Sequence, residues 1–485
     1  MNIPEEIQFI VEKIREEKHE AYLVGGCVRD LLRKTKPKDW DIATNAKPEE
    51  IEEIFPKTFS NNNFGTVTVV TESADPTLRE VEITPYRIDE KYTDKRHPDE
   101  IKWAQSIEED LSRRDFTVNA LALGPDLELV DPFEGQKDLK EKVIKAVGEA
   151  QDRFSEDALR MMRAVRFAVS LGEKPWQIEE KTKEGIKKNA NLLSFISKER
   201  IRDEFLKIIN CSNGAVGIEI LRRLGLLKNI IPELEEGFGV GQNKHHIYQI
   251  YQHSLLSLNY ACCNNYSTEV RMASLLHDIG KPRTKEGEGL NSTFYNHEIV
   301  GAKIAWRILE RLRFSRKEIE KIVKLVRYHL FYYNVGEVTE SSVRRLLRKV
   351  GREDIEELIE VRKADRIGSG VPKAEPYKLR HLRYIVDKVS RDPISVKMLK
   401  VSGTNIMDIL NISPGLKIGQ ILSCLLGQVL SQPERNKKEL LIEEIKRLGA
   451  LSDKELAKLS QEAEEEINKI ETKRDQMTKK KYWIT

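Results

Sequence analysis

A double glycine between a predicted strand and a predicted helix, followed closely by two aspartates, constrains this 485-residue chain more than any other feature. Residues 21–24 read as a strand, Gly25 and Gly26 as a tight turn, and residues 28–32 as the start of a helix. Glycine lets the backbone approach a ligand closely, and a helix N-terminus presents unpaired N–H groups to phosphate. The run therefore predicts a phosphate cradle.

The two aspartates, Asp39 and Asp41, alternate with apolar residues, so on a strand both carboxylates point to one face. Carboxylates placed side by side repel each other unless a cation lies between them, and hard oxygen ligands suit Mg²⁺. A third acid is expected on the alternating residues 79–84, where Glu82 lies between two apolar residues and Glu80 is a competing choice. A phosphate cradle beside a Mg²⁺ site predicts two-metal phosphoryl transfer. An Asp-x-Asp pair taken alone is more often a solvated turn.

Bulk composition bounds the classes of protein that this chain can represent. Its length allows several domains, and its net charge of only +3 means that any nucleic-acid surface is a local patch. No apolar run reaches transmembrane length, and the acidic N-terminus is unlike a signal peptide, so no membrane partner is expected. The five cysteines lack Cys-x-x-Cys spacing, which favours reduced thiols and a cytoplasmic location.

Strand-like runs gather near the N-terminus, at residues 21–24, 40–42, 66–70, 81–86 and 127–130. Beyond about residue 145 nearly everything has a helical period with polar faces. The pattern predicts a mixed α/β head followed by helices.

With its glycine turn and three acids, the sequence resembles the nucleotidyltransferase superfamily that includes DNA polymerase β. Further motifs narrow the resemblance to the class II CCA-adding enzymes and their bacterial poly(A) polymerase relatives. Five segments of this chain are similar to family motifs and occur in the family's order. They match the flexible loop (92–98), the ribose-recognition motif (109–120), the head–neck segment (131–139), the nucleotide-selecting helix (156–163) and the last shared motif (197–205). The resemblance implies that Asp39, Asp41 and Glu82 are catalytic.

The resemblance also implies a set of nucleotide-binding residues, namely Gly25, Gly26, Arg29, Arg113, Arg114, Asp115, Asn119, Asp157, Arg160, Arg163 and Arg166. Arg113 and Arg114 have a fork geometry that matches phosphate oxygens. Asp115 and Asn119 can hydrogen-bond ribose hydroxyls. Without the resemblance, ordinary surface ion pairs explain this segment equally well.

Base selection is expected from Asp157 and Arg160, which lie three residues apart and would share one face of a helix. Aspartate accepts hydrogen bonds and arginine only donates them, so the pair offers a mixed edge. The resemblance implies that this edge selects CTP or ATP, whereas spacing alone favours a simple salt bridge. Arg163 and Arg166 continue the basic face toward triphosphate or RNA.

A second site is predicted where six of the nine histidines lie, between residues 245 and 329. Residues 275–281 resemble the HD phosphohydrolase motif, and the resemblance places metal ligands at His253, His277, Asp278, His297, His329 and Asp365. Imidazole with carboxylate suits Ni²⁺, Mn²⁺, Co²⁺, Fe or Zn²⁺ better than Mg²⁺ alone. Such a metal would activate water against a phosphoester, with Lys281 binding the phosphate. By analogy with the family, the substrate is expected to be a 2′,3′-cyclic phosphate. A purely structural role for the six predicted ligands is the alternative. The histidines at 245–246 fit ordinary surface or core residues.

The C-terminal region resembles that of bacterial CCA-adding enzymes at residues 401–405 and 413–419, although Asn405 stands where the family often has Asp. Such a tail would grip the tRNA elbow through its backbone shape. The charged end, residues 451–485, is expected to be a solvated helix.

Together these features predict an α+β chain with four domains: a polymerase-β-like nucleotidyltransferase head with a small mixed sheet (1–145), a helical neck (146–225), an HD domain (226–375) and a helical tail (376–485). The predicted activity is addition or repair of the 3′-terminal CCA of tRNA from CTP and ATP. The alternatives are a poly(A) polymerase, a CC-only or A-only enzyme, and an HD phosphohydrolase whose head only binds RNA. The oligomeric state is left open.

Overall fold

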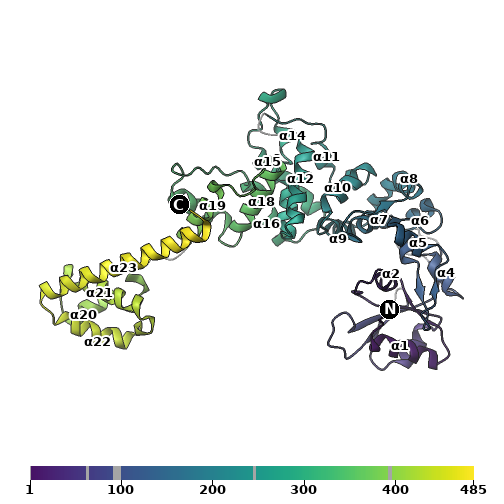
Figure 1. Cartoon of the computed structure of the whole chain (residues 1–485), viewed down its shortest axis with the longest axis horizontal. Helices are drawn as coiled ribbons and strands as arrows, with labels where there is room; N and C mark the ends of the chain where they lie inside the picture. Colours follow the sequence, from purple (N-terminus) through teal and green to yellow (C-terminus); the bar gives the residue numbers. More distant parts are fainter. Residues whose placement is uncertain (1, 62–64, 91–99, 244–246, 391–395, 485) are drawn as a thin grey trace. The chain divides into compact units, whose positions relative to one another are not determined.

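The structure is a computed structural model, and it describes residues 2–61, 65–90, 100–243, 247–390 and 396–484. The chain divides into two compact units, one formed by Met1–Leu330 with Glu356–Ala374 and the other by Phe331–Ile355 with Glu375–Thr485. Figure 1 shows strands gathered in the N-terminal part of the first unit, and helices in nearly all of the rest. The predicted α+β class is confirmed.

The head contains a seven-stranded mixed sheet with the order β3-β4-β5-β2-β1-β8-β9. Its strands are β1 (Ala21–Val24), β2 (Asp41–Thr44), β3 (Thr58–Asn61), β4 (Thr66–Val70), β5 (Glu80–Pro85), β8 (Ala122–Leu123) and β9 (Leu129–Val130). Strands β2 and β5 run parallel, and the other neighbours are antiparallel. Two small pairs lie outside this sheet: β6 (Arg87–Glu90) with β7 (Glu100–Trp103), and β10 (Val143–Ile144) with β11 (Gln177–Ile178).

One face of the sheet is covered by α1 (Glu5–Glu16) and α3 (Pro48–Ile54). Ile7 and Ile51 from these helices join a buried core with Leu23, Ile42 and Ile83 from β1, β2 and β5. Because side chains alternate along a strand, the residues beside Ile42 and Ile83 point to the opposite face. Asp41 and Glu82, which precede these two isoleucines, therefore lie on that opposite face.

Helices form the rest of the first unit. In the head they are α2 (Gly26–Leu32), α4 (Ile107–Ser112), η1 (Thr117–Asn119) and α5 (Gly135–Glu141). They continue as α6 (Ala150–Glu156), α7 (Leu159–Ser170), α8 (Glu180–Asn189), η2 (Ala190–Phe195), α9 (Lys198–Ile209), α10 (Gly214–Arg223), η3 (Leu227–Asn229) and α11 (Pro232–Glu235). The last are α12 (Ile250–Cys263), α13 (Thr268–Leu276), α14 (Lys281–Thr284), η4 (Gly289–Asn291), α15 (His297–Arg311), α16 (Arg316–Tyr328) and most of α18 (Ile355–Gly368).

The second unit is helical in its described part. It contains α17 (Glu340–Val350), α19 (Tyr377–Ser390), η5 (Val396–Met398), α20 (Gly403–Leu410), α21 (Leu416–Ser431), η6 (Pro433–Arg435), α22 (Lys438–Gly449) and α23 (Asp453–Tyr482). Residues 331–355 therefore group with the C-terminal region by contact, and the domain limits inferred from the sequence stay a prediction. No helix of the described chain has both the length and the apolar character needed to cross a membrane.

Candidate active sites

The acidic edge of the head is built by the parallel pairing of β2 and β5. Asp41 is directly opposite Glu82 in the register, whereas Glu80 pairs with Val70 of β4. Asp39 precedes the strand and is exposed, so only Asp41 of the predicted pair lies within it. Burial raises the pKa of the Asp41 carboxyl to about 6; Arg114 opposes this rise, and Asp39 and Glu82 add to it. An all-oxygen set whose charges repel each other fits a hard cation such as Mg²⁺.

The double glycine lies at the same edge. Gly25 has a φ of +73°, a backbone conformation that favours glycine, and a Cβ placed there would lie 2.6 Å from Nη1 of Arg114, so a side chain would displace that guanidinium group. A Cβ on Gly26 would lie 3.9 Å from Oδ1 of Asp39, which brings that carboxylate beside the turn. Gly25 precedes helix α2, as the sequence predicts. The turn therefore joins a helix N-terminus to the acidic edge.

A chain of hydrogen bonds links this turn to the ribose motif and to helix α7. Arg29 donates from Nη1 to Asn119 Oδ1 at 2.7 Å, and Asn119 Nδ2 donates to Asp115 Oδ1 at 3.1 Å. Arg163 on α7 donates from Nε to Asp115 Oδ2 at 2.7 Å. Burial favours a higher pKa for Asp115, but Arg163 and the Asn119 hydrogen bond overcome it and lower the pKa to about 2. Asp115 is therefore a charged acceptor held between two segments.

The two arginines of the ribose motif share a buried carboxylate that the sequence did not single out. Arg113 donates from Nη2 to Oδ1 of Asp110 at 2.6 Å, and Arg114 donates from Nη2 to Oδ2 at 3.1 Å. Asp110 has only 1% of its surface exposed. It fixes both guanidinium groups in place, so Asp110 is an orienting residue for this motif.

The expectation that Asp157 and Arg160 share a face of one helix is wrong. Helix α6 ends at Glu156, Asp157 has an extended backbone, and α7 begins at Leu159. Asp157 Oδ1 accepts the Leu159 N–H at 3.0 Å, which ends one helix and begins the next. The two side chains also have different partners, because Asp157 accepts from Arg200 and Arg160 donates to Glu156. They nevertheless flank one helix junction beside the ribose motif, where Arg160 donates to the backbone oxygen of Arg113 at 3.1 Å.

Phe167 of α7 is a further feature that the sequence did not reveal. Its buried ring lies near three guanidinium groups, at 5.4 Å from Arg29, 5.3 Å from Arg163 and 4.0 Å from Arg166. Arg166 also donates from Nε to the buried carboxylate of Glu204 on α9 at 2.7 Å. A single aromatic side chain therefore lies against Arg29 of α2 and two arginines of α7.

The six residues predicted to be HD ligands come from five helices or helix ends. His253 lies in α12, His277 and Asp278 directly follow α13, and His297 begins α15. His329 directly follows α16, and Asp365 lies in α18. The structure brings all six residues together, and each is buried.

Backbone carbonyls orient three of the four imidazoles. Nδ1 of His277, His297 and His329 hydrogen-bonds the carbonyl oxygen three residues earlier in each case, at 2.8, 2.7 and 2.7 Å. A neutral ring that donates from Nδ1 leaves Nε2 as the metal-binding atom. The buried Nε2 of His297 lies 3.4 Å from Asp278 Oδ1 and makes no hydrogen bond among the described residues. These residues therefore fit a metal ion.

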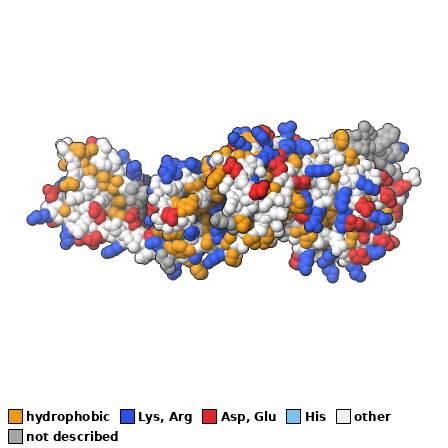
Figure 2. All heavy atoms as spheres, turned by 90° about the horizontal axis from the view of Figure 1, so that it is seen from above, with side chains coloured by type: hydrophobic (Ala, Val, Ile, Leu, Met, Phe, Trp, Pro, Cys, Tyr) orange, Lys and Arg blue, Asp and Glu red, His pale blue; other side chains and the backbone are white. Residues whose placement is uncertain are grey.

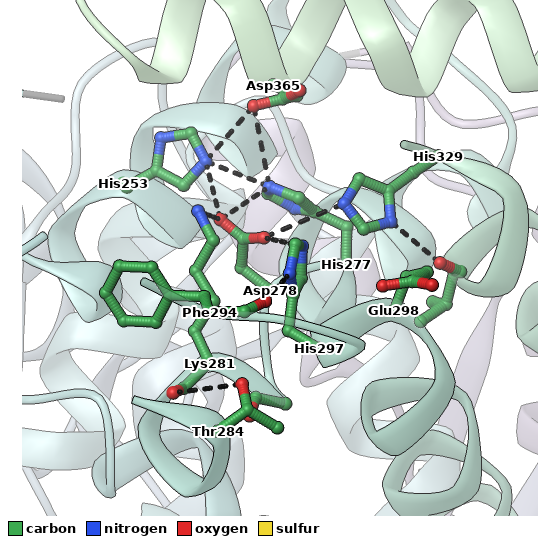
Figure 3. A network of polar contacts seen from close by, with 12 residues as sticks. His253, His277, Asp278, Lys281, Thr284, Phe294, His297, Glu298, His329 and Asp365 are labelled. Carbon is green, nitrogen blue, oxygen red and sulfur yellow. Dashed lines mark hydrogen bonds and ion pairs between the residues drawn. The ribbon is translucent and has the colours of Figure 1, made fainter. Parts of the chain in front are cut away.

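Asp278 lies between two ligand groups, as Figure 3 shows. Its Oδ2 is 3.2 Å from Nε2 of both His253 and His277, which form one group with Asp365. Its Oδ1 is 3.4 Å from His297 Nε2 and 3.7 Å from His329 Nε2. One carboxylate therefore faces both groups, an arrangement that suits two ions sharing a bridge.

The charges in this cluster favour metal binding. The imidazole of His277 and the ammonium of Lys281 hold the pKa of Asp278 well below its ordinary value despite burial. Burial and the neighbouring His277 lower the pKa of His329 to about 3, so its ring is neutral. Burial alone would lower the pKa of His253, but its hydrogen bonds to Asp278 and Asp365 raise it to about 9. A bound cation would take the place of that proton.

Lys281 is buried and lies at this centre, with Nζ 2.7 Å from Asp278 Oδ2 and 2.7 Å from Gln242 Oε1. A cavity of about 670 Å³ opens beside the ligands. It is lined by Asp278, His297, His329 and Asp365, and also by Lys281, Arg362 and Arg366. The predicted loop at 92–98 and the histidine pair at 245–246 lie outside the described residues.

The fold and the head define the class of this protein as a nucleotidyltransferase with a polymerase-type head and an HD domain. Family models match residues 21–145 (Poly A polymerase head domain), 176–238 (Probable RNA and SrmB- binding site of polymerase A) and 250–369 (HD domain).

Curated relatives narrow the class to a family. The chain is 34% identical to the CCA-adding enzyme of Ligilactobacillus salivarius over 92% of its own length and 98% of that protein. It is 51% identical to the CCA-adding enzyme of Lactobacillus delbrueckii subsp. bulgaricus over 41% of its length, which spans about half (48%) of that relative. The chain belongs to the CCA-adding enzyme family.

Solved structures agree with this assignment. The Bacillus stearothermophilus CCA-adding enzyme in complex with CTP matches with a TM-score of 0.59 and 26% identity, covering 92% of this chain and 98% of that one. A CCA-adding enzyme in complex with ATP matches at 21% identity and a TM-score of 0.51, covering 91% of this chain and 94% of that one. The second match supports the fold alone.

Proposed function

We propose that this chain adds the 3′-terminal CCA to tRNA, taking its nucleotides from CTP and ATP. The observation that carries the proposal is the acidic edge of the head, where Asp41 and Glu82 are opposite each other on neighbouring strands and Asp39 lies beside the glycine turn. The relative from Ligilactobacillus salivarius, similar over nearly its whole length, supports the same activity.

In this proposal the head carries out nucleotidyl transfer. The 3′-hydroxyl of the RNA bonds to the α-phosphorus of the nucleotide, and the bond from that phosphorus to pyrophosphate breaks. The turn at Gly25 and Gly26 holds the phosphates, while Asp39, Asp41 and Glu82 are the candidate metal ligands. Mg²⁺ bound there would stabilise charge on the phosphoryl oxygens and favour ionisation of the attacking hydroxyl.

The head and the neck together are proposed to bind the ribose and to select the nucleotide. Asp115 and Asn119 offer oxygen and amide groups to the ribose, with Arg29 and Arg163 fixing their positions. Asp157 and Arg160, at the junction of α6 and α7, are proposed to read the base edge, although they do so from two segments rather than one helix face. The tail from residue 376 is proposed to bind the tRNA.

The decisive assay offers tRNA lacking CCA to the purified protein with CTP and ATP, separately and together. Addition of C, C and A in that order supports the proposal. A long A tract made from ATP alone would favour a poly(A) polymerase, an alternative that is consistent with the match to the Poly A polymerase head domain. Arrest after CC, or addition of A only to a CC end, would identify a partial enzyme.

We further propose that the HD domain hydrolyses phosphoesters. Its six assembled ligands and the buried Lys281 support this activity. A transition-metal ion such as Ni²⁺, Mn²⁺ or Co²⁺ would polarise the phosphoryl oxygen and activate water. It would be held by His253, His277 and Asp365 or by the second group, which consists of Asp278, His297 and His329. Lys281 is placed to neutralise phosphate charge beside Asp278.

The test of this second activity is release of product from p-nitrophenyl phosphate and from a 2′,3′-cyclic nucleotide with each of these metals. His277→Ala is expected to abolish hydrolysis and to leave CCA addition nearly intact, because the head site uses other residues. If the wild type hydrolyses neither substrate and purifies without transition metal, the HD ligands are only structural.

A further inference from the structure

The cavity beside the HD ligands is larger and more basic than one phosphate group requires. Its volume is about 670 Å³. Cavities between roughly 300 and 1,000 Å³ hold whole organic ligands, so a single phosphate would leave most of this space unfilled. Lys281, Arg362 and Arg366 bring three cationic side chains to its lining.

These three cations differ in how they are neutralised. Lys281 lies 2.7 Å from Asp278, and Arg362 forms an ion pair with Asp365, so both are tied to the metal ligands. Arg366 forms no ion pair with a carboxylate within the described part of the chain, although the neighbouring Asp365 acts on it at longer range; its hydrogen bond runs from Nη2 to the carbonyl oxygen of Lys373 at 3.4 Å. Its Nε is buried without a partner among the described residues. Arg366 is therefore available to an anion that enters the cavity.

The position of Arg366 separates it from the metal ligands. It lies one helical turn after Arg362 on α18, so both side chains project from one side of that helix. Arg362 is held at Asp365, whereas Arg366 lines the same cavity together with Ser369 and Val371 from the residues that follow it. An anion on Arg366 would thus be a different group from the phosphate at the metal ligands.

Tyr295 adds an aromatic surface to the same cavity. It lines the cavity, yet the residue is 71% exposed, so its ring is open to a ligand. Nucleobases stack on aromatic rings of this kind with little regard to base identity. Two positions for phosphate groups and one aromatic ring for a base together match the parts of a nucleotide that carries two phosphates.

We propose that this cavity binds a nucleoside with two phosphate groups, one at the HD ligands and the second on Arg366, with its base against Tyr295. The proposal rests on the proposed hydrolase activity and specifies its substrate. A phosphorylated 3′ end of an RNA strand and a free nucleoside 3′,5′-bisphosphate share this chemistry. In the reaction, the oxygen of water bonds to the terminal phosphorus and the P–O bond to the ribose breaks. The ribose oxygen takes up the proton that water loses, which yields a 3′-hydroxyl and inorganic phosphate.

The experiment compares four substrates of the full chain: adenosine 3′-monophosphate, adenosine 3′,5′-bisphosphate, an RNA oligomer with a 3′-phosphate, and glycerol 2-phosphate. Arg366→Met is expected to lower the ratio of kcat/KM for the bisphosphate to that for the monophosphate by about tenfold, as loss of a charge-assisted hydrogen bond does. Tyr295→Ala is expected to lower kcat/KM for the nucleotides relative to glycerol 2-phosphate. Arg307→Met is the matched control, because Arg307 is exposed on α15 and does not line the cavity.

Binding supplies a readout that is independent of turnover. Equilibrium dialysis of chelator-treated protein is expected to show tighter binding of the bisphosphate than of the monophosphate, and Arg366→Met is expected to remove the difference. Preference for the oligomer would identify the 3′ end of an RNA strand as the substrate. Preference for the free bisphosphate would identify a small-molecule substrate.

Equal binding of the two nucleotides by the wild type, with active hydrolysis of glycerol 2-phosphate, would overturn the second phosphate site and leave the hydrolase standing. A wild type without hydrolysis of any substrate would refute the hydrolase, and the dialysis result would still decide whether Arg366 binds a second phosphate.

Discussion

Asp41→Asn is expected to make the metal-free head more stable at neutral pH while removing its activity. In the folded chain the Asp41 carboxyl has a pKa of about 6, chiefly because it is buried, against an ordinary value of 3.8. Above pH 6 the folded state must therefore carry a charge that the unfolded chain carries at less cost. At about 1.36 kcal/mol for each pKa unit, the difference corresponds to about 3 kcal/mol of lost stability. The loss is complete above pH 6 and absent below about pH 4.

The measurement is denaturation of wild type and Asp41→Asn at several pH values between 4 and 8, in a chelator and in Mg²⁺. In the chelator, the free energy of unfolding of Asp41→Asn should exceed that of wild type as the pH rises through 6. The difference should shrink in Mg²⁺, because the ion stabilises the wild-type carboxylate. Asp39→Asn is the matched control, since Asp39 is exposed and its replacement relieves little burial.

Nucleotide addition should fall by at least about 100-fold in both variants, because each loses a proposed metal ligand. If the free energy of unfolding depends on pH in the same way for Asp41→Asn and wild type in the chelator, the Asp41 carboxylate does not destabilise the metal-free fold. Residual addition above a few per cent of wild type would refute the role of Asp41 as a metal ligand.

Three further predictions concern the neck and the HD centre. Asp157→Ala or Arg160→Ala should impair discrimination among the four nucleotides more than triphosphate affinity, since an unpaired buried group costs about 1–3 kcal/mol; unchanged fidelity would make both residues structural. Phe167→Leu keeps an apolar side chain but loses the cation–π contacts, worth about 0.5–2 kcal/mol, so KM for nucleotides should rise with little change in kcat; an unchanged KM would contradict it. Asp278→Ala should lower metal content at both ligand groups and Asp365→Ala at one, as measured by elemental analysis; equal losses would refute the bridge.

The parts of the fold that the sequence predicted are those with a strong local pattern. The strands at 21–24 and 66–70 lie where the alternation placed them. The two-residue strand β8 is too short to show a period, and its pairing beside β1 depends on long-range contacts; β9 occupies only the last two residues of the strand predicted at 127–130. Helical period in the later chain was equally clear, which is why the α+β class followed from the sequence.

The break at Asp157 shows why spacing alone misplaced a proposed site residue. Residues 156–163 contain no glycine or proline, so the run reads as one continuous helix. The break comes instead from the Asp157 side chain, which accepts the Leu159 N–H, and from Arg200 on α9. An aspartate before an apolar run is a recognised helix-start signal and was the available clue. No such clue marked Phe167, because a buried phenylalanine in an amphipathic helix looks like any core residue.

The HD centre was predicted from the order of its ligands, but its division into two groups depends on how α13 ends. His277 and Asp278 directly follow that helix, and the His277 Nδ1 contact with the carbonyl of Ser274 turns Nε2 toward His253. Asp278 then extends between the rings, with one oxygen toward His253 and His277 and the other toward His297. Adjacent residues in the sequence thus serve different purposes, since His277 belongs to one group and Asp278 faces both. The ligand that matters most to the whole centre is therefore Asp278, even though Asp365 carries the same carboxylate chemistry.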